Sequence, residues 1–479
     1  MGGLYFAIYN DIGFNADFVT YFMKMKSRGQ DDTSFETDTS PCINQVNYNQ
    51  ALMCLSKREI QNYKQINYTY GYHHTKINDT SDNYVQPFSD PKLHKVQKYP
   101  ELRTRPIRKL LCNGSVYNYT DLVQSANLTE RDLDTTSDVE IILPLYIQYG
   151  LEKTLQMIKG DYSFVLTENT GTFDTKKTNV YVARDPMGMR SLYMVSSTDP
   201  KRLFYMFVSE LSSVPEFILK NTSEFTVSEV PPGSYWSFQG ALDKDSKSLP
   251  FCKWFNMESE LKYLVPTPDQ LSRLYNEIRE TTTSAVLRRY NTDVSFGILL
   301  AGFDSCIILA VLLKNYPQLD IDLITIGETD IRVAEECVDY CRRMYPESQL
   351  RHHKLSVDKK TRSVQTRSPM DYLVEYVLSH TNIKVLLSGY YLDELFQLEI
   401  PPTLNYDEMY NGIEFAFPFT DLTFVSLINS ISLSLKSPQR YDYTKSPIEK
   451  YIIRKAFDID YKYLPYSVLW ARSKTASLR

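Results

Sequence analysis

The sequence predicts two domains of different fold class: an α+β N-terminal domain with stacked, largely antiparallel sheets, and an α/β C-terminal domain with a parallel sheet. In the N-terminal half, short apolar runs follow one another closely with polar turn residues between them, a spacing that favours antiparallel pairing. In the C-terminal half, near-continuous apolar strands end in glycine and alternate with longer helical patterns, which is typical of a parallel sheet. Residues 246–268 between the halves are polar, charged and contain proline, so they indicate a linker.

The N-terminal domain is expected over residues 1–245. Its first strand is the apolar run LYFAIY, which begins almost at the first residue. Later apolar runs, bounded by Asn, Asp, Ser and Thr, are expected to be further strands. These runs are 68–72, 107–112, 139–147, 162–168, 180–185 and 203–210.

The C-terminal domain is expected over residues 269–479. The spacing of apolar residues predicts helices over 271–290 and 306–316. Strands are expected at 294–302, 319–328 and 383–389. Because ligands of such sheets bind at the carboxyl ends of the strands, the residues that follow these strands are the candidates for a binding site.

Composition limits the classes of partner. The chain has 479 residues and a formal net charge of −5, and a nucleic-acid interface needs clustered Lys and Arg instead. No apolar run reaches the length of about 20 residues that a membrane span needs, and the first residues lack the pattern of a secretory signal. We therefore expect a cytoplasmic protein with neither nucleic acid nor membrane as a partner.

Two segments after predicted strands carry the chemistry. In AGFDS (301–305), glycine and a helix start follow a strand, an arrangement whose backbone N–H groups can hold an anion. Asp304 would meet Mg²⁺ or a phosphate-bound water there, although the same residue could simply cap the helix. In SGYYLDELF (388–396), a Ser-Gly pair and two acidic residues follow another strand, so both segments could face one nucleotide.

The chain resembles the glutamine-hydrolysing asparagine synthetases over nearly its whole length. Segments similar to the family's motifs occur in the family's order. They are RGQD (28–31), GYHHTKIND (71–79), NGSVYN (113–118), SDVEII (137–142), KGDYSF (159–164), ARDPMG (183–188), SEL (209–211), PPG (231–233), AGFDS (301–305), ITIG (324–327), SGYYLDELF (388–396), GIEFAFPFTD (412–421), IEKYIIR (448–454) and LWARSK (469–474).

The resemblance implies the fold and the reaction. The N-terminal domain would be an Ntn-hydrolase-like, type-2 glutamine amidotransferase domain, and the C-terminal domain an adenine-nucleotide alpha-hydrolase-like (PP-loop) domain. In this family the first domain releases ammonia from glutamine. In the second domain, ATP with Mg²⁺ activates aspartate as an acyl-adenylate, which ammonia converts to asparagine. Family members often associate, so a homodimer is implied by analogy.

The resemblance also assigns residues. Gly2 occupies the position of the nucleophile, and Asn113 and Gly114 occupy that of the oxyanion hole. The implied glutamine-binding positions are His74, Ser115 and Asp138. The ATP-binding positions are Leu300, Gly302, Asp304, Ser305, Ile326, Ser388 and Gly389. Lys450 is implied to be catalytic together with Asp304, and Asp304 and Asp393 are the implied metal ligands.

Departures from the family pattern fall on the chemistry. The family has Cys where this chain has Gly2, and glycine has no side chain with which to form a thioester. His74 and Ser115 replace the family's Arg and Glu. The loop at 301–305 lacks one of the family's glycines, and Tyr390 and Tyr391 replace a Glu and a Gly, which would place two rings along the path of the ATP phosphates.

Two interpretations of function remain open. The first is an asparagine-synthetase-type ligase that has lost glutamine hydrolysis and depends on free ammonia. The second is a catalytically inactive member of the family that keeps the fold and serves as a nucleotide-binding scaffold. A further alternative is that the sequence as written differs from that of an active enzyme at position 2.

Overall fold

The computed structural model describes most of the chain in segments. These are residues 2–10, 16–37, 40–43, 50, 67–77, 85–91, 106–129, 132–170, 177–241, 247–248, 250–257, 260–290, 294–355, 369–396, 409–438, 447–459 and 463–471. Parts of two family-like segments, residues 78–79 and 472–474, lie outside this range. The chain divides into two compact units, residues 1–256 with 403–412, and residues 257–402 with 413–479.

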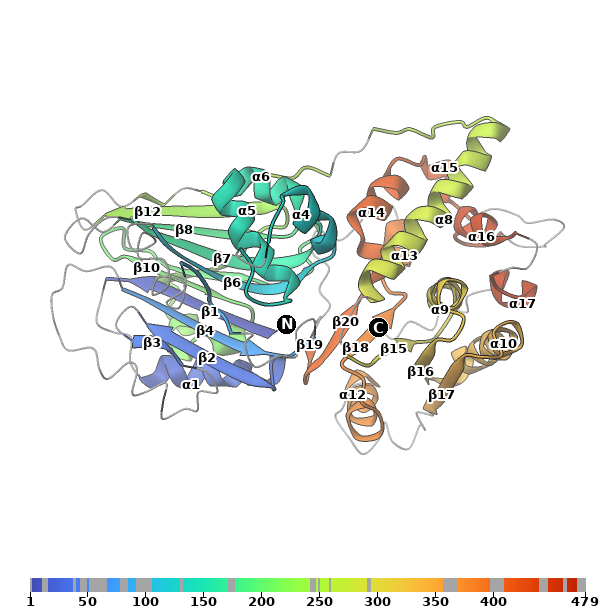
Figure 1. Ribbon diagram of the computed structural model, residues 1–479, viewed down its shortest axis with the longest axis horizontal. Coiled ribbons are helices and arrows are strands. Elements are labelled where there is room, and N and C mark those ends of the chain that lie inside the picture. The colour runs from blue at the N-terminus through green and yellow to red at the C-terminus, as the bar shows by residue number, and fades with distance from the viewer. Residues whose placement is uncertain are drawn as a thin grey trace. The chain divides into compact units, whose positions relative to one another are not determined.

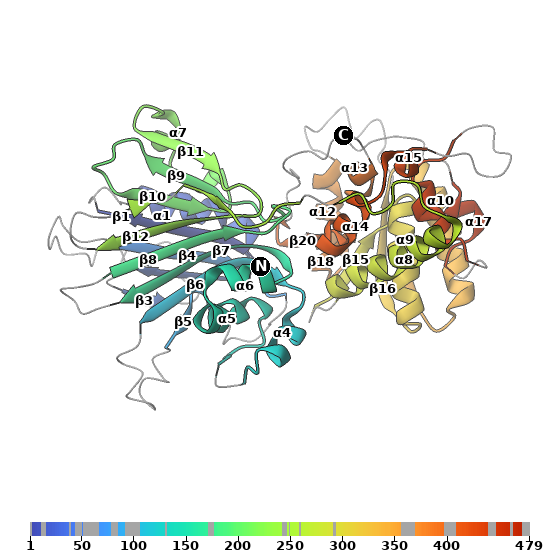
Figure 2. The same ribbon diagram turned by 90° about the horizontal axis from the view of Figure 1, so that it is seen from above.

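The first unit is built on two sheets (Figures 1 and 2). One sheet has the order β11 (Phe225–Glu229), β9 (Tyr193–Ser197), β10 (Phe204–Val208), β1 (Gly2–Tyr9), β4 (Asn67–His74), β2 (Asp32–Thr37) and β3 (Ser40–Ile43). The other has the order β13 (Lys247–Ser248), β12 (Ser234–Ala241), β8 (Lys177–Arg184), β7 (Gly160–Thr170), β6 (Ile107–Val116) and β5 (Phe88–Asp90), with β14 (Cys252–Lys253) also paired to β12. The described strand pairs of both sheets are antiparallel, as the sequence predicts.

Strand β1 shows why the sheets stack. Because side chains alternate along a strand, Leu4, Phe6 and Ile8 join the core that contains both sheets. Tyr5, Ala7 and Tyr9 point to the other face and pack with residues of α1 (Ala16–Lys24). Both faces of β1 are therefore buried, which explains the continuous apolar run at the start of the chain.

The predicted strand at 139–147 is wrong. This run forms the 3₁₀ helix η3 (Asp138–Ile141) and the helix α5 (Ile142–Tyr149). A short apolar run does not separate a buried strand from a buried helix, and Pro144 is tolerated in the first turn of α5. The other helices among the described residues of this unit are η1 (Met25–Arg28), α4 (Tyr119–Ser125), α6 (Leu151–Met157), η5 (Leu211–Ser213) and α7 (Glu216–Lys220).

The second unit is an α/β fold with a parallel sheet, as the sequence predicts. Its strands run in the order β17 (Gln349–Leu355), β16 (Asp320–Ile326), β15 (Phe296–Leu299), β18 (Val385–Ser388) and β20 (Ile413–Ala416), and each neighbouring pair is parallel. Figure 1 shows α9 (Phe303–Asn315) and α10 (Glu328–Met344) on one side of this sheet and α12 (Pro369–His380) on the other.

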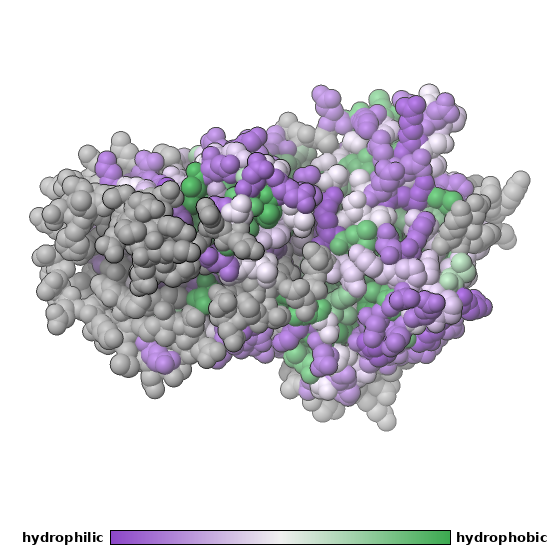
Figure 3. All heavy atoms as spheres, viewed as in Figure 1, coloured by the Kyte–Doolittle hydropathy of each residue, from purple (hydrophilic) through white to green (hydrophobic). Residues whose placement is uncertain are grey.

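Further helices complete this unit. They are α8 (Pro268–Tyr290), α13 (Leu392–Phe396), η6 (Pro418–Thr420), α14 (Leu422–Asn429), α15 (Leu433–Lys436), α16 (Tyr451–Phe457) and α17 (Tyr466–Leu469). The short strand β19 (Met409–Tyr410) lies beside β20 at the edge of this sheet. The face of the second unit seen in Figure 3 is mostly hydrophilic, with apolar residues in small separate patches. Within the described residues, no helix is both long and apolar enough to cross a membrane.

Candidate functional site

Strand β1 carries Gly2 into the interior of the first unit. The Gly2 backbone N–H donates to Asn113 Oδ1 over 3.1 Å, and Gly2 pairs with His74 of β4. A Cβ atom at position 2 would lie 1.5 Å from the carbonyl oxygen of His73, far inside any van der Waals contact. The position therefore lacks a nucleophile and also lacks space for a side chain in this backbone arrangement.

A second glycine, Gly29, also lies close to the peptide bond between His73 and His74. A Cβ atom at Gly29 would lie 2.3 Å from the carbonyl oxygen of His73 and 2.4 Å from the nitrogen of His74. Backbone approaches this close are open only to glycine. Gly2 and Gly29 thus bring two other segments of the first unit against the peptide that joins His73 to His74, a relationship that the sequence did not indicate.

The two histidines are buried and held neutral. Burial, with positive charge nearby, lowers the pKa of His74 far below its usual range. Burial also lowers the pKa of His73 to about 4. Its Nε2 donates to the Phe22 carbonyl over 2.9 Å and its Nδ1 accepts from the Thr33 hydroxyl over 2.9 Å. A neutral His74 cannot supply the fixed positive charge of the family's arginine at this position.

The remaining glutamine-site positions are close to one another on β6 and η3. Asn113 is fully buried, and its Nδ2 has no hydrogen-bond partner among the described residues. Gly114 follows with φ of +147°, and a Cβ atom there would lie 2.1 Å from the Asp161 carbonyl oxygen. Ser115 is buried, and Asp138 Oδ2 accepts from the backbone N–H of Val116 over 2.7 Å. The structure thus places Gly2 against Asn113, with Gly114 and Ser115 next along β6 and Asp138 bonded to that strand at Val116.

The carboxyl ends of three parallel strands meet in the second unit. Leu299 of β15 pairs with Ser388 of β18 and with Ile324 of β16. The nucleotide-site positions Leu300, Ile326 and Ser388 are all buried at this edge. Their proximity is a consequence of the sheet order, since parallel strands end at the same edge.

The loop between β15 and α9 is fixed by its own hydrogen bonds. Leu300 donates to the Ile324 carbonyl over 2.7 Å and accepts from the Thr325 hydroxyl over 2.7 Å. Ser305 Oγ accepts from the Ala301 N–H over 2.8 Å. Gly302 is the N-cap residue of α9, so the alternative that Asp304 caps this helix is wrong. Space around Gly302 is open, because a Cβ atom there would contact no atom within 4 Å.

Lys450 joins the two acidic positions. Its Nζ lies 2.5 Å from Asp304 Oδ2 and 2.6 Å from Asp393 Oδ1. The Lys450 side chain is 7% exposed and that of Asp393 is 60% exposed, so the ammonium is buried and the group opens to solvent at Asp393. Burial alone would lower the pKa of Lys450, but the attraction of Asp304 and Asp393 outweighs it and raises that pKa.

Asp304 fits the donor type that Mg²⁺ prefers. Its Oδ1 is buried and has no hydrogen-bond partner within the described segments. The described residues contain no group of three or more His, Cys, Asp or Glu side chains placed to hold a metal. Mg²⁺ in nucleotide sites takes only one or two carboxylates together with phosphate oxygens, so Asp304 and Asp393 remain suitable ligands. Lys450 bonds to one carboxylate oxygen of Asp304 and one of Asp393, a contact that the sequence did not reveal.

Tyr391, which the sequence predicts to lie along the path of the ATP phosphates, has a buried side chain. It adopts φ of +75°, the left-handed region that favours glycine, and its side chain is 4% exposed. Its ring lies 4.9 Å from that of Phe417 in an edge-on contact. Tyr390 is half-buried, with its ring 6.5 Å from that of Phe417. The backbone thus accepts an unfavourable conformation while the Tyr391 ring is buried in the core.

One residue near this site, Arg454, was not singled out in the sequence analysis. Arg454 lies 4.1 Å from the ring of Phe303 and donates to the Leu469 carbonyl over 2.6 Å, so it ties the start of α9 to α17. Gly389 packs against the start of α9, where a Cβ atom would lie 2.8 Å from the nitrogen of Ser305. Gly389, by contrast, is one of the ATP-binding positions that the resemblance implies.

Fold and site together define a glutamine-amidotransferase-type unit on the same chain as a parallel α/β unit with a nucleotide-type loop. Residues 61–230 match the family model of the glutamine amidotransferase domain, and residues 406–478 match that of asparagine synthase. Both units are therefore similar to the asparagine synthetase family.

Similar proteins agree with this family. The chain is 27% identical over 418 residues to asparagine synthetase [glutamine-hydrolyzing] 2 of Oryza sativa subsp. japonica, covering 76% of this chain and 64% of that protein. The values for asparagine synthetase [glutamine-hydrolyzing] of Zea mays are 27% identity, 76% and 65%. A probable asparagine synthetase of Acanthamoeba polyphaga mimivirus is 26% identical over 462 residues, with 84% and 75% covered. The chain thus covers less than two thirds of the two plant proteins.

A solved structure also aligns over most of the chain. It is the glutamine phosphoribosylpyrophosphate amidotransferase of B. subtilis, with a TM-score of 0.37, 14% identity, and 90% of this chain and 95% of that chain covered. A likeness this low supports no argument about this protein.

Proposed function

We propose that this protein is an asparagine-synthetase-type carbon–nitrogen ligase that uses free ammonia. It would convert aspartate to asparagine with ATP, through an acyl-adenylate of aspartate, and without hydrolysing glutamine. The observation that carries the proposal is the placement of Lys450 between Asp304 and Asp393 in the second unit. This buried ammonium adjoins a helix start that has open space at Gly302.

The geometry suits a reaction in which pyrophosphate leaves. Negative charge builds up on the departing phosphates, so a buried cation and backbone N–H donors at that point lower the barrier. Lys450 would offset this charge, and the loop held by Leu300 and Ser305 would keep the N–H groups oriented. Asp304 and Asp393 would hold Mg²⁺, which when bound neutralises phosphate charge.

Glutamine hydrolysis is excluded from the proposal for three reasons. Gly2 has no atom that could attack an amide carbonyl. In addition, the carbonyl of His73 occupies the space into which a side chain at position 2 would project. Neutral His74 and Ser115 replace the charged pair that the family uses to bind the substrate's carboxylate and amine.

The test is an assay of purified protein with ATP, Mg²⁺ and aspartate, in which pyrophosphate and asparagine are followed. We expect both products with ammonium chloride and neither with glutamine. Lys450→Met should lower pyrophosphate release by about 10²–10³-fold, since a charge that stabilises the leaving group is lost. Lys455→Met is the matched control on α16, because its ammonium pairs with Asp458 over 3.0 Å and does not reach Asp304. Glutamate release from glutamine would contradict the proposal.

A second candidate is a nucleotide-binding scaffold without turnover. It is favoured by the approach of Gly389 to the nitrogen of Ser305, which narrows access to one N–H at the start of α9. The loop at 301–305 lacks one of the family's glycines, which also narrows access to the N–H groups at the start of α9. Binding of ATP in equilibrium dialysis without pyrophosphate release, in the presence of aspartate and ammonia, would favour this candidate. Sedimentation analysis of the same sample tests the homodimer that the family implies.

A further inference from the structure

A cavity of the α/β unit lies at the amino ends of the strands. It has a volume of about 830 Å³ and is lined in part by Phe296 and Asp320, the first residues of β15 and β16. Leu300, Ile326 and Ser388 lie at the carboxyl ends of their strands, at the opposite edge of the sheet. The cavity is therefore separate from the nucleotide-type site.

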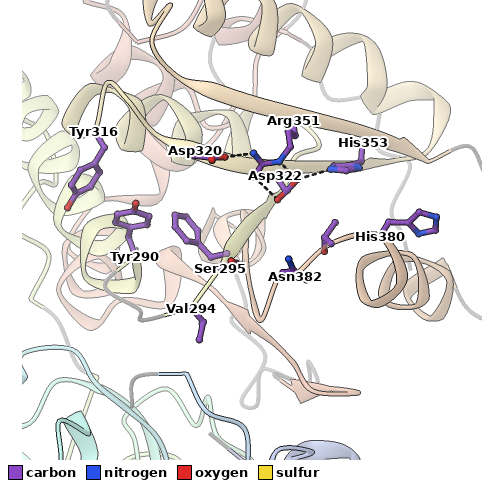
Figure 4. A pocket seen from close by; sticks show the side chains of 12 residues that line it. Tyr290, Val294, Ser295, Tyr316, Asp320, Asp322, Arg351, His353, His380 and Asn382 are labelled. Atoms are coloured by element: carbon purple, nitrogen blue, oxygen red, sulfur yellow. Dashed lines mark hydrogen bonds and ion pairs between the residues drawn. The ribbon is translucent and has the colours of Figure 1, made fainter. Parts of the chain in front are cut away.

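One wall of this cavity is a network of ionic side chains (Figure 4). Arg351 donates to both carboxylate oxygens of Asp322, over 2.9 Å and 3.0 Å, and also to Asp320 Oδ1. His353 lies 2.8 Å from Asp322 Oδ1 through its Nε2. Strand geometry explains the arrangement, because Asp320 and Asp322 share one face of β16, and Arg351 and His353 share one face of β17.

This network carries more negative than positive charge. Two carboxylates face one guanidinium, and three of the guanidinium donor bonds already point at those carboxylates. Although burial alone would raise the pKa of Asp322, its bonds to Arg351 and His353 lower it, so this carboxyl stays ionised near neutral pH. The Asp320 side chain is 55% exposed and can accept further hydrogen bonds. An anion would meet a neutralised arginine here, whereas a cation would meet a carboxylate.

The opposite wall is aromatic. Tyr290 lies between two rings, with its centroid 4.2 Å from that of Phe296 and 4.8 Å from that of Tyr316. Figure 4 shows Tyr290 and Tyr316 together on the side away from His353. Aromatic faces attract cations and stack on flat apolar groups. The attraction of these rings for cations agrees with the negative charge of the other wall.

We propose that this cavity binds a small organic cation that has a flat apolar portion, an arylalkylamine in chemical class. The ammonium group would bond to Asp320 at the rim, and the ring would pack on Tyr316 and Tyr290. The proposal is independent of the reaction at the other edge of the sheet. It adds a ligand class that neither aspartate, ammonia nor ATP represents.

The test uses tyramine as the probe and 4-hydroxyphenylacetate, which has the same ring with a carboxylate, as its matched control. Calorimetric titration of the full chain at low salt should show tyramine binding, with the acid at least roughly tenfold weaker. Asp320→Asn should weaken tyramine binding about fivefold, because one exposed charge is removed. Tyr316→Leu should weaken it as well, through loss of the ring contact.

Asp339→Asn supplies the control for a general effect of charge. Asp339 is 71% exposed on α10 and does not line the cavity, so this variant should bind tyramine like the parent protein. Melting temperatures of all three variants show whether the fold is retained. The proposal is overturned if tyramine does not bind, if the acid binds equally well, or if a folded Asp320→Asn variant binds tyramine with unchanged affinity.

Discussion

Lys450 Nζ lies 2.5 Å from Asp304 Oδ2, although the two residues are 146 positions apart in the sequence. The contact joins the start of α9 to the residue that precedes α16. Lys450 itself adopts φ of +55°, a left-handed conformation that non-glycine residues rarely take. Strained backbone of this kind persists where the surrounding structure requires it, which agrees with a functional position for the ammonium.

Removal of the Lys450 charge should destabilise the second unit. Lys450→Met leaves the Asp304 carboxylate without its partner in a buried position, and breaking such a pair costs roughly 3–5 kcal/mol. Asp393→Asn should cost less than about 1 kcal/mol, because that carboxylate is mostly exposed. Denaturant unfolding of the two variants measures both values. The double variant Lys450→Met/Asp304→Asn should recover part of the loss, and an additive double variant would contradict the ion-pair interpretation.

A methyl group at position 2 should destabilise the first unit. In Gly2→Ala the new carbon overlaps the His73 carbonyl, so β1 and β4 must separate locally, and we expect a loss of about 1–3 kcal/mol. Gly302→Ala is the matched control, since open space surrounds that position and the loss should stay below about 1 kcal/mol. Melting temperatures compare the two variants. Gly2→Cys should for the same reason fail to restore glutaminase activity, and glutamate release by that variant would show that the backbone yields.

Stability should fall as pH drops from about 6.5 to 4. The pKa of His73 is lowered from 6.5 to about 4 by burial, so between these values the unfolded chain takes up a proton that the folded chain does not. The free energy of unfolding therefore rises with pH across this window, and His73 contributes about 3 kcal/mol to that rise. His73→Gln should reduce the slope of the unfolding free energy against pH, leaving the part that buried His74 contributes. His380→Gln, which removes an exposed imidazole, should leave the dependence unchanged.

The two tyrosines after β18 should respond differently to truncation. Tyr391→Gly removes a ring buried against Phe417, a loss only partly offset by relief of the left-handed backbone, so we expect a cost of about 2–4 kcal/mol. Tyr390→Gly should cost less than about 1–2 kcal/mol, because that ring is half-buried and more distant from Phe417. Thermal unfolding gives the comparison. Equal losses would mean that the two rings contribute alike to the core.

Much of the architecture was predictable from local patterns. The apolar run at Leu4–Tyr9 gave a buried strand because both of its faces are covered, and the glycine-terminated strands of the second half gave a parallel sheet. The run at 139–147 was misassigned because a short apolar segment fits a buried helix equally well.

The sequence by itself determined which atoms are available: no side chain at Gly2, and an ammonium and carboxylates at Lys450, Asp304 and Asp393. Residue types and their order follow from the chain, and so does the chemistry they can perform. Only the tertiary structure decided that the His73 carbonyl fills the space beside Gly2, and that one ammonium holds two carboxylates. Those relationships depend on strand register and on the packing of segments that are distant in sequence, which no local pattern encodes.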